Sequence, residues 1–431
     1  MHRTRLIAAL TLTVACFGST FSFAADLEWP TWRGPNRDAV SLETGLLTEW
    51  SQDGPPLLWQ ANGLGKGYSS VTISNGRIFT TGQIRDKSDR QRTQTVLLAL
   101  DLADGTQLWT APLDTDRKQP NAAPTIDGNR VYALGRAGDL ICVDAPTGKA
   151  LWKKNLTRDF GGKMMSGWGY SESPLVDGAL LICTPGGKDA MIVALDKRSG
   201  ETVWKSAVPD DLGRRGNDGA GYSSIVISNA GGIKQYVQLT GRGVIGVAAD
   251  DGRFLWNYNR VANGTANIST PIVKDNYVFA STGYKTGAAL IELKRSGDGI
   301  EAEEKYFLGR DDMQNHHGGM VRIGDYIYCG HGHNEGYPLC IEMKTGKVAW
   351  REDEGAGRNS AAIAYADGHL YFRYQDGIMA LVQATPNAYN LKGTFKLATL
   401  NGRSWPHPVI LGGRLYIRDN DALLCYDVKQ K

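Results

Sequence analysis

A short motif that recurs along the chain constrains its fold more than any other feature of the sequence. The stretch 142–152 reads Cys-Val-Asp-Ala-Pro-Thr-Gly-Lys-Ala-Leu-Trp, with an acidic residue eight positions before the Trp and a Gly four before it. The same spacing returns at 101–109, 196–204 and 342–350, while 248–256 keeps the Gly and Trp and lacks the acid. An apolar strand, a Gly turn and a second strand ending on Trp predict a β-hairpin. Self-similarity at a period of roughly 40–50 residues is typical of solenoids and propellers.

The Trp residues that close these hairpins allow the repeats to be counted. They stand at positions 59, 109, 152, 204, 256 and 350, and the last gap is about two periods long. A degenerate copy at 304–307 fills that gap, and another at 393–395 follows Trp350. A further hairpin precedes each closing Trp, as at 71–79 and 125–132. Two hairpins per repeat give the four strands of a propeller blade.

The two ends of the chain complete this count. The last unit, 408–427, has only three strands, and the orphan strand 55–59 supplies the fourth. Pairing these ends closes the ring and leaves no open sheet edge. The sequence therefore predicts an all-β, eight-bladed propeller of four-stranded antiparallel blades over residues 55–431. Seven blades would follow if one degenerate copy were a loop.

The N-terminus has the pattern of a secretory signal peptide. Met-His-Arg-Thr-Arg is followed by the apolar run 6–17 and by Ser-Phe-Ala at 22–24, which predicts a signal over 1–24 and a lead-in segment over 25–54. The run is too short to span a bilayer. We therefore expect a periplasmic or secreted protein. Anchoring through Cys16 is the less favoured alternative, because Thr13 stands where a lipobox prefers Leu.

The charge of the chain bears on its partners. The formal net charge is +3, from 48 Lys and Arg and 45 Asp and Glu. Removing the signal with Arg3 and Arg5 leaves 46 − 45 = +1. A nearly neutral protein lacks a basic footprint, which argues against nucleic acid as a partner. We expect a monomer that binds a small molecule, a carbohydrate or an envelope protein.

The cysteines fit a packing role. Cys142, Cys340 and Cys425 stand two residues before the acidic position of the repeat, where other copies have Ala. Cys in such a small, buried slot behaves as a small hydrophobe. Only Cys329 and Cys340, which flank one hairpin loop, are spaced for a disulfide, and the sequence leaves that bridge open.

The repeat resembles the tryptophan-docking motif of PQQ-repeat proteins, the quinoprotein alcohol dehydrogenase-like propellers. The stretch 29–38, Trp-Pro-Thr-Trp-Arg-Gly-Pro-Asn-Arg-Asp, looks like the lead-in of exported bacterial members. The resemblance runs from residue 29 to the end and implies an eight-bladed fold. Members include PQQ- and Ca²⁺-dependent dehydrogenases and a scaffold of outer-membrane-protein assembly that binds no quinone. The dehydrogenases have a vicinal Cys pair, a Ca²⁺ site of Glu, Asn and Asp, and a catalytic Asp. This sequence has no vicinal Cys pair and no Cys-x-x-Cys-His.

Histidines give the strongest local signal on the predicted loop face, where loops precede the innermost strands and join the second strand of each blade to the third. His316 and His317 precede blade six, His331 and His333 lie in its middle loop, and His407 precedes blade eight. Such a cluster can supply a transition-metal site or a general base. We take His316 and His317 as candidate catalytic residues, His331 and His333 as metal ligands, and His407 as a ligand contact. The alternative is that they bond loop backbone or contact solvent and ligand.

A second set of polar residues suits a hard cation. Glu172, Asn267 and the pair Asp311 and Asp312 precede blades three, five and six, and carboxylate and amide oxygens are what Ca²⁺ prefers. The resemblance implies Ca²⁺-ligand roles for Glu172 and Asn267 and catalytic roles for Asp312 and Glu172. The alternative is that Glu172 and Asn267 cap loop backbone.

Aromatic and basic residues on the same face suit a sugar, because aromatic faces stack on sugar rings and Arg pairs with carboxylate or sulfate. The aromatic candidates are Trp168, Tyr170, Tyr222, Tyr284 and Trp405, and the basic ones are Lys188, Arg214, Arg215, Arg358 and Arg373. Of these, we take Trp168, Tyr170, Arg358 and Trp405, together with Asn267 and His407, as binding residues. Ordinary loop packing is the alternative.

Three functions follow as hypotheses. The first is a binding propeller of the cell envelope that recognises a carbohydrate or another envelope ligand. The second is an alcohol or sugar dehydrogenase that uses PQQ and Ca²⁺. The third is a polysaccharide lyase or hydrolase that depends on the histidine cluster, with or without a transition metal.

Overall fold

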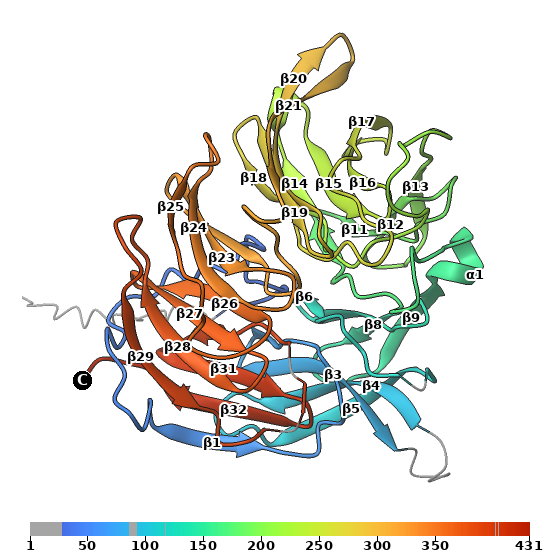
Figure 1. Ribbon diagram of the computed structural model, residues 1–431. Helices are drawn as coiled ribbons and strands as arrows, with labels where there is room; N and C mark the ends of the chain where they lie inside the picture. Colours follow the sequence, from blue (N-terminus) through green and yellow to red (C-terminus); the bar gives the residue numbers. More distant parts are fainter. Residues whose placement is uncertain (1–27, 86–92, 117, 401, 404) are drawn as a thin grey trace, which may run out of the picture.

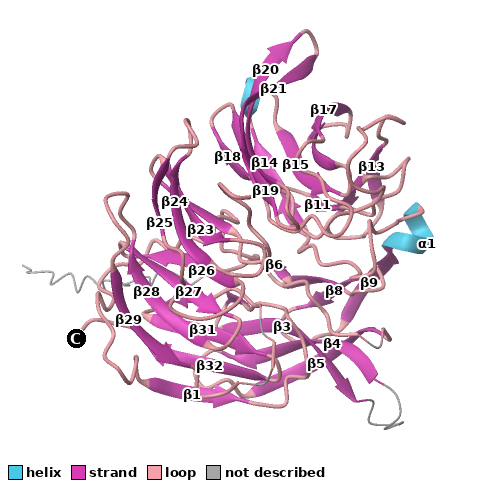
Figure 2. Ribbon diagram, in the orientation of Figure 1, coloured by secondary structure: helices cyan, strands magenta, loops and turns pink. Residues whose placement is uncertain are grey.

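Eight four-stranded antiparallel sheets form a ring, which confirms the predicted propeller and its blade count (Figure 1). The computed structural model describes residues 28–85, 93–116, 118–400, 402–403 and 405–431. The predicted signal peptide and Cys16 lie outside them. Strands and loops make up nearly all of the chain, with a short helix α1 (Leu156–Phe160) and a 3-10 turn η1 (Ala230–Gly232) (Figure 2).

Each blade contributes one strand to each of four layers, counted outward from the axis. The innermost strands are β2 (Thr72–Ser74), β6 (Thr125–Asp127), β10 (Leu175–Asp177), β14 (Val226–Ser228), β18 (Ile272–Lys274), β22 (Met320–Ile323), β26 (Ala361–Ala366) and β30 (Val409–Leu411). The second strands are β3 (Arg77–Arg85), β7 (Arg130–Leu134), β11 (Leu180–Cys183), β15 (Gln235–Thr240), β19 (Tyr277–Thr282), β23 (Tyr326–His331), β27 (His369–Tyr374) and β31 (Arg414–Asp419). The third strands are β4 (Thr93–Asp101), β8 (Asp139–Asp144), β12 (Ile192–Asp196), β16 (Gly243–Ala248), β20 (Gly287–Ser296), β24 (Tyr337–Glu342), β28 (Ile378–Gln383) and β32 (Ala422–Asp427). The outermost strands are β5 (Gln107–Asp114), β9 (Ala150–Asn155), β13 (Thr202–Ser206), β17 (Phe254–Tyr258), β21 (Gly299–Gly309), β25 (Val348–Arg351), β29 (Leu391–Lys396) and β1 (Leu57–Ala61).

The ring closes where the N-terminal strand joins the C-terminal blade, as predicted. β1 pairs antiparallel with β32, with Trp59 opposite Cys425 and Gln60 opposite Leu424. Figure 1 shows the two strands side by side, one from each end of the chain. The closure gives blade eight its fourth strand, so this sheet is complete like the other seven.

The repeated Gly and Trp form the contact between neighbouring blades. Gly148 in the outer hairpin of blade two packs on Trp109 of blade one, and a Cβ added there would lie 2.6 Å from that ring. The same arrangement joins Gly105 to Trp59 and Gly200 to Trp152. All three glycines have a φ between 71° and 75°, a conformation that costs other residues about 1–2 kcal/mol. The turn therefore requires Gly for both its backbone and its packing.

Hydroxyl groups link the blades near the axis. The backbone N–H of Ala123 in blade two donates to the Ser173 hydroxyl of blade three over 3.2 Å. The N–H of Ser173 donates to Ser224 of blade four, and that of Ser224 to Thr270 of blade five, both over 3.0 Å. These bonds satisfy buried backbone donors that no sheet partner reaches.

The cysteines are all buried and free in the described part of the chain. The bridge left open between Cys329 and Cys340 does not form. Cys329 pairs with Leu339 and Cys340 with Tyr328, so consecutive pairs along the ladder carry the two thiols on opposite sides of the sheet. Cys329 packs between blades five and six, and Cys340 packs between blades six and seven.

The lead-in segment enters the channel enclosed by the innermost strands. Trp29 pairs with β2 of blade one, and Val40 pairs with β26 of blade seven. Between them, Arg37 donates to the Ser173 carbonyl of blade three over 2.6 Å, and Arg33 donates to the Met320 carbonyl of blade six. The segment is therefore held from several sides of the ring and fills the middle of the channel.

No helix in the described residues is long and apolar enough to cross a membrane.

Replacing Gly148 by Ala should destabilise the protein more than replacing Gly128 by Ala. Both positions have positive φ, at 71° and 54°, but a Cβ at Gly128 meets nothing within 4 Å whereas one at Gly148 meets Trp109. We expect about 1–2 kcal/mol for the backbone term at each site and a further 1–3 kcal/mol or so for overpacking at Gly148 alone. Urea unfolding followed by tryptophan fluorescence measures the difference. Equal shifts for the two variants would contradict the docking role.

Candidate functional site

The innermost hairpins place one equivalent residue of each blade around the same cavity. In blade one this residue is Tyr68, four positions before Thr72, which pairs with Phe79. Aligning the other blades on the same pairing gives eight equivalent positions, of which seven line one pocket of about 620 Å³. These seven are Tyr68, Asn121, Ser171, Tyr222, Ile268, His317 and Trp405. A cavity touched at one repeat position from seven blades lies on the axis, so we call it the axial pocket. Its volume is ordinary for a small-molecule site, about 300–1,000 Å³.

The lead-in segment adds a wall that no blade supplies. Trp32 lines the axial pocket, and its ring lies 5.3 Å from that of His407 in an edge-on contact. The Arg33 guanidinium lies 5.4 Å from the centre of the same indole ring, within the range of a cation–π contact. The axial pocket is therefore incomplete without residues that precede the propeller in the sequence.

A run of aromatic rings forms one side of the axial pocket. Tyr68 stacks on Trp405 with 4.4 Å between ring centres, and Trp405 stacks on His317 at 4.5 Å. The ring centres of His317 and His316 are 3.6 Å apart, and those of His316 and His333 are 4.4 Å apart. We call these five residues, from blades one, eight and six, the aromatic wall. The structure thus brings His316, His317, His333, His407 and Trp405 of the predicted set into one pocket.

Hydrogen bonds fix two of the imidazoles. His316 Nδ1 lies 3.0 Å from the Ser360 hydroxyl, and its Nε2 lies 3.2 Å from the Tyr284 hydroxyl. His333 Nδ1 accepts a bond of 3.1 Å from the Tyr284 backbone N–H. Both rings are thus oriented by neighbouring blades, which suits a preformed binding surface.

Burial keeps the pocket histidines uncharged. It lowers the pKa of both His316 and His407 to about 3 and that of His317 well below its usual range. The pKa of His333 is also lowered, first by burial. Desolvation disfavours the charged imidazolium, and the clustered rings disfavour it further. These side chains therefore line the pocket as neutral, polar rings near pH 7.

Six predicted site residues do not line the axial pocket: His331, Asp312, Arg358, Glu172, Asn267 and Tyr170. His331 is 8% exposed, and its Nδ1 accepts from the Gln314 backbone N–H over 3.2 Å. Asp312 is exposed, and its carboxylate accepts from the Gly309 backbone N–H over 3.1 Å, which caps a turn. Arg358 is exposed and does not line the pocket.

Glu172 is buried beside the channel and outside the axial pocket. Its Oε2 accepts from the Thr184 backbone N–H over 2.9 Å, whereas Oε1 has no partner. In blade one the equivalent residue is Ser69, whose hydroxyl accepts from the equivalent N–H of Thr81. Glu172 thus takes over a serine's structural bond, and burial raises its pKa to about 8.

Asn267 and Tyr170 also serve the backbone. The Asn267 amide donates to the carbonyls of Thr240 and Gly241 over 2.9 and 3.1 Å, while its oxygen accepts from the Asn263 N–H. The Tyr170 hydroxyl donates to a loop carbonyl over 2.8 Å. For Asn267 the structure therefore favours the alternative of loop capping.

The donors required by a Ca²⁺-bound quinone do not converge. The carboxylate of Glu172, the amide of Asn267 and the carboxylate of Asp312 each bond local backbone rather than a common cavity. No group of three or more His, Cys, Asp or Glu side chains in the described ranges is placed to hold a metal ion. The residues present do not fit the quinone site implied by the sequence resemblance.

Trp168 stands at the mouth of the axial pocket on a backbone that is tightly held. Trp168 is 51% exposed, although its side chain is a large hydrophobic ring. Arg136 of blade two donates to the carbonyls of Gly167 and Trp168 and pairs with Asp116 over 3.3 Å. The Trp168 N–H donates to the Tyr222 hydroxyl of blade four over 3.4 Å. An exposed aromatic ring on a fixed backbone is the arrangement of a binding platform.

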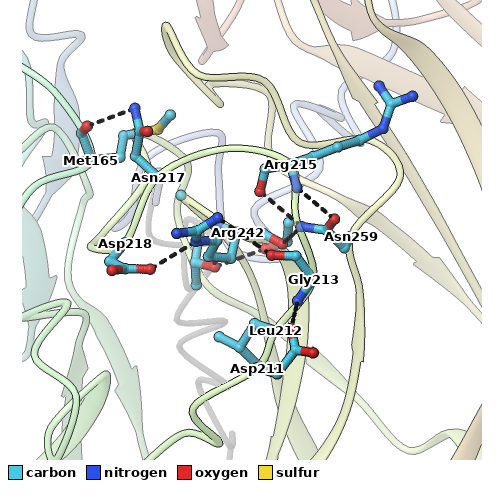
Figure 3. Close-up of polar contacts among 12 residues, drawn as sticks. Met165, Asp211, Leu212, Gly213, Arg215, Asn217, Asp218, Arg242 and Asn259 are labelled. Atoms are coloured by element: carbon cyan, nitrogen blue, oxygen red, sulfur yellow. Dashed lines mark hydrogen bonds and ion pairs between the residues drawn. The ribbon is translucent and has the colours of Figure 1, made fainter.

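The neighbouring loop of blade four is braced in the same way (Figure 3). Arg242 pairs with Asp218 over 2.7 Å, and Asn217 donates to the Met165 carbonyl of the blade-three loop over 3.4 Å. Asn259 bonds the backbone of Arg215 in both directions, while the Arg215 side chain extends away from these contacts. The Arg215 side chain therefore takes no part in bracing this loop.

Trp32, Tyr68 and Asn121 are among the pocket residues that sequence reasoning missed. Trp32 belongs to the lead-in, and no local pattern places that segment inside the channel. Tyr68 and Asn121 share the repeat position of His317 and Trp405, so alignment of the first hairpins on one another could have found them.

Comparison with known proteins places the chain among PQQ-repeat propellers. Two curated relatives match: outer membrane protein assembly factor BamB of Xanthomonas campestris, 28% identical over 36% of this chain and 37% of its own length, and tetrathionate hydrolase of Acidithiobacillus ferrooxidans, 26% identical over 75% of this chain and 54% of its own length. The chain thus spans about half or less of the length of these relatives.

Solved structures show the same fold at low identity. BamB of Moraxella catarrhalis has a TM-score of 0.60 at 15% identity and covers 87% of this chain and 98% of its own. The quinohemoprotein alcohol dehydrogenase of Comamonas testosteroni has a TM-score of 0.63 at 15% identity, covering 94% and 81%.

A family profile described as outer membrane protein assembly factor BamB matches residues 92–352, which is 261 of 431 residues. Since the match covers more than half of the chain and the blades are those of the PQQ-repeat fold, the chain belongs to this PQQ-repeat β-propeller family.

Proposed function

We propose that this protein is a carbohydrate-binding propeller and that the axial pocket is its binding site. We also infer export to the periplasm or cell surface, which rests on the signal pattern over 1–24. The observation that carries the proposal is the aromatic lining of the axial pocket together with the exposed ring of Trp168 at its mouth. Flat aromatic faces stack on the apolar faces of sugar rings, as they do on other ring systems.

The polar lining supports a neutral or weakly anionic saccharide. The amides of Asn121, Asn334, Asn359 and Gln375 can both donate and accept, as sugar hydroxyls require. Arg403 is the only Lys, Arg, Asp or Glu among the described lining residues. A pocket without a carboxylate does not provide the carboxylate pair by which most glycoside hydrolases act.

A second candidate is a protein-binding scaffold of the cell envelope. The family description and the curated relative from Xanthomonas both name an outer membrane protein assembly factor. The outermost strands expose apolar residues beside the docking tryptophans, including Leu58, Leu108, Leu151 and Val203, which are 43–55% exposed. Capture of an envelope protein by a variant that lacks saccharide binding would favour this candidate.

Replacing Trp405 by Ala should weaken saccharide binding by about tenfold or more, because the central ring of the aromatic wall is lost. Titration calorimetry with soluble gluco-, manno-, xylo- and uronate-containing trisaccharides measures Kd, and chromatography of the same samples detects cleavage. Val203→Ala, on an outer strand, is the matched control. If none of these sugars binds the unaltered protein, the proposal fails, and release of shortened sugars would favour a lyase or hydrolase.

Arg136 should act on binding only through Trp168. Arg136→Gln frees the Gly167 and Trp168 carbonyls, so we expect weaker saccharide binding and greater quenching of Trp168 fluorescence by acrylamide. In a Trp168→Ala background the same change should have little further effect on Kd, which a double-mutant cycle measures. Arg136→Lys should restore binding in part. Additive losses in the cycle would contradict a positioning role.

Binding of a neutral saccharide should be nearly independent of pH between about 5 and 8. The pKa of His316 and His407 is about 3 in the folded protein. Both imidazoles are therefore neutral throughout the range of about pH 5 to 8 and become charged only in stronger acid. Calorimetric titrations at pH 5, 6, 7 and 8 check this. A loss of affinity with a midpoint near pH 6.5 would mean that the imidazoles titrate as exposed groups.

A further inference from the structure

A second pocket lies further along the channel than the axial pocket. It has a volume of about 420 Å³ and is enclosed by the lead-in segment and the innermost strands of blades three to six. Its apolar side includes Val176, Ile227 and Val273, which occupy one repeat position, the residue that follows Thr72 in blade one. We call this cavity the lower pocket.

One residue of the lower pocket departs from the repeat. The position shared by Val176, Ile227 and Val273 is Val or Ile in six blades and Tyr in blade seven, and blade six has Arg322 there instead. Arg322 is half-buried, lines the lower pocket and donates through Nη1 to the Gly324 carbonyl over 2.5 Å. A cation on an otherwise apolar ring has no packing role that the repeat explains.

Two buried arginines of the lead-in lie beside it. Arg33 is 3% and Arg37 is 5% exposed, and both donate only to backbone carbonyls in the described structure, Arg37 to Ser173 and Pro174. Their Nε atoms have no partner. Arg37 also lines the lower pocket. A buried guanidinium without a bonded carboxylate is costly unless an anion completes it.

The two arginines that line the lower pocket have no bonded carboxylate. Arg37 and Arg322 both line it, and neither forms an ion pair among the described residues. Asp38, which lines the pocket, acts electrostatically on Arg322, and Glu172, which does not line it, acts on Arg37. Burial raises the pKa of both carboxyls. Neither guanidinium is bonded to a carboxylate of the protein, which leaves both able to donate to an anionic ligand.

We propose that the lower pocket binds an aliphatic monocarboxylate, with the carboxylate held by Arg37 and Arg322 and the chain lying over the apolar residues of blades three to five. The exposed amide of Asn36 at the rim can donate to the same carboxylate. A carboxylate suits these two side chains because Arg binds planar carboxylates through paired hydrogen bonds. The apolar walls require a ligand with a hydrocarbon part. This site is independent of the proposed saccharide site.

Calorimetric titration of the full chain with octanoate, 1-octanol and acetate tests the proposal. Octanoate should bind with one-to-one stoichiometry, and both octanol, which lacks the charge, and acetate, which lacks the chain, should bind about tenfold more weakly or worse. Equal binding of octanol and octanoate, or no binding of octanoate, would overturn the proposal.

A variant pair places the site. Arg322→Gln should weaken octanoate binding by about tenfold because one charge-assisted bond is lost. Lys274→Gln removes an exposed cation at the end of β18, next to Val273 but outside the lower pocket, and should leave octanoate binding unchanged. Where Arg322→Gln fails to fold, Val273→Glu, which adds a negative charge to the pocket wall, replaces it and should abolish binding. Unchanged octanoate affinity in a folded variant would refute the assignment.

Discussion

The packing of a Gly turn against the Trp of the preceding blade is the contact on which this structure depends. A four-stranded blade cannot bury both of its faces alone, so it is stable only when stacked on its neighbours. The close approach of Gly148 to Trp109, repeated at Gly105 and Gly200, sets the angle between blades and so the number that closes the ring. Trp59 of β1 docks on blade one, so the last joint of the ring is made by the same contact as the others.

A ring built this way leaves a channel on its axis, and the lead-in segment divides that channel in two. Arg33 and Arg37 attach the segment to carbonyls of blades six and three, while Trp32 faces the axial pocket and Asp38 faces the lower pocket. A stretch that precedes the propeller therefore shapes both cavities. The cost is two buried guanidinium groups, which backbone carbonyls alone satisfy poorly.

The fold could be predicted from the sequence because its signal is repeated and local. Each closing Trp, each Gly turn and the orphan strand before Trp59 stand at fixed spacings, and eight blades follow from counting them. The site was predicted in part. His316, His317 and Trp405 precede innermost strands and meet in one pocket, whereas His331, only two residues from His333, bonds local backbone. Contacts between distant segments, such as Trp32 with His407, leave no local pattern in a single sequence.

Function in a repeat fold is found where equivalent positions stop being equivalent. Four residues before Thr72 and its counterparts, the chain varies among Tyr, Asn, Ser, Ile, His and Trp, because side chains there face the axis and are free of the docking constraint. At the repeat position that follows Thr72, six blades have Val or Ile and blade seven has Tyr, since there the side chains surround the lead-in, and Arg322 is the one charged residue. Glu172 shows the limit of this reasoning, because it replaces a serine of the repeat and still makes that serine's bond to backbone. A departure from the repeat therefore indicates a ligand only when the residue also faces a cavity, as Arg322 and His317 do.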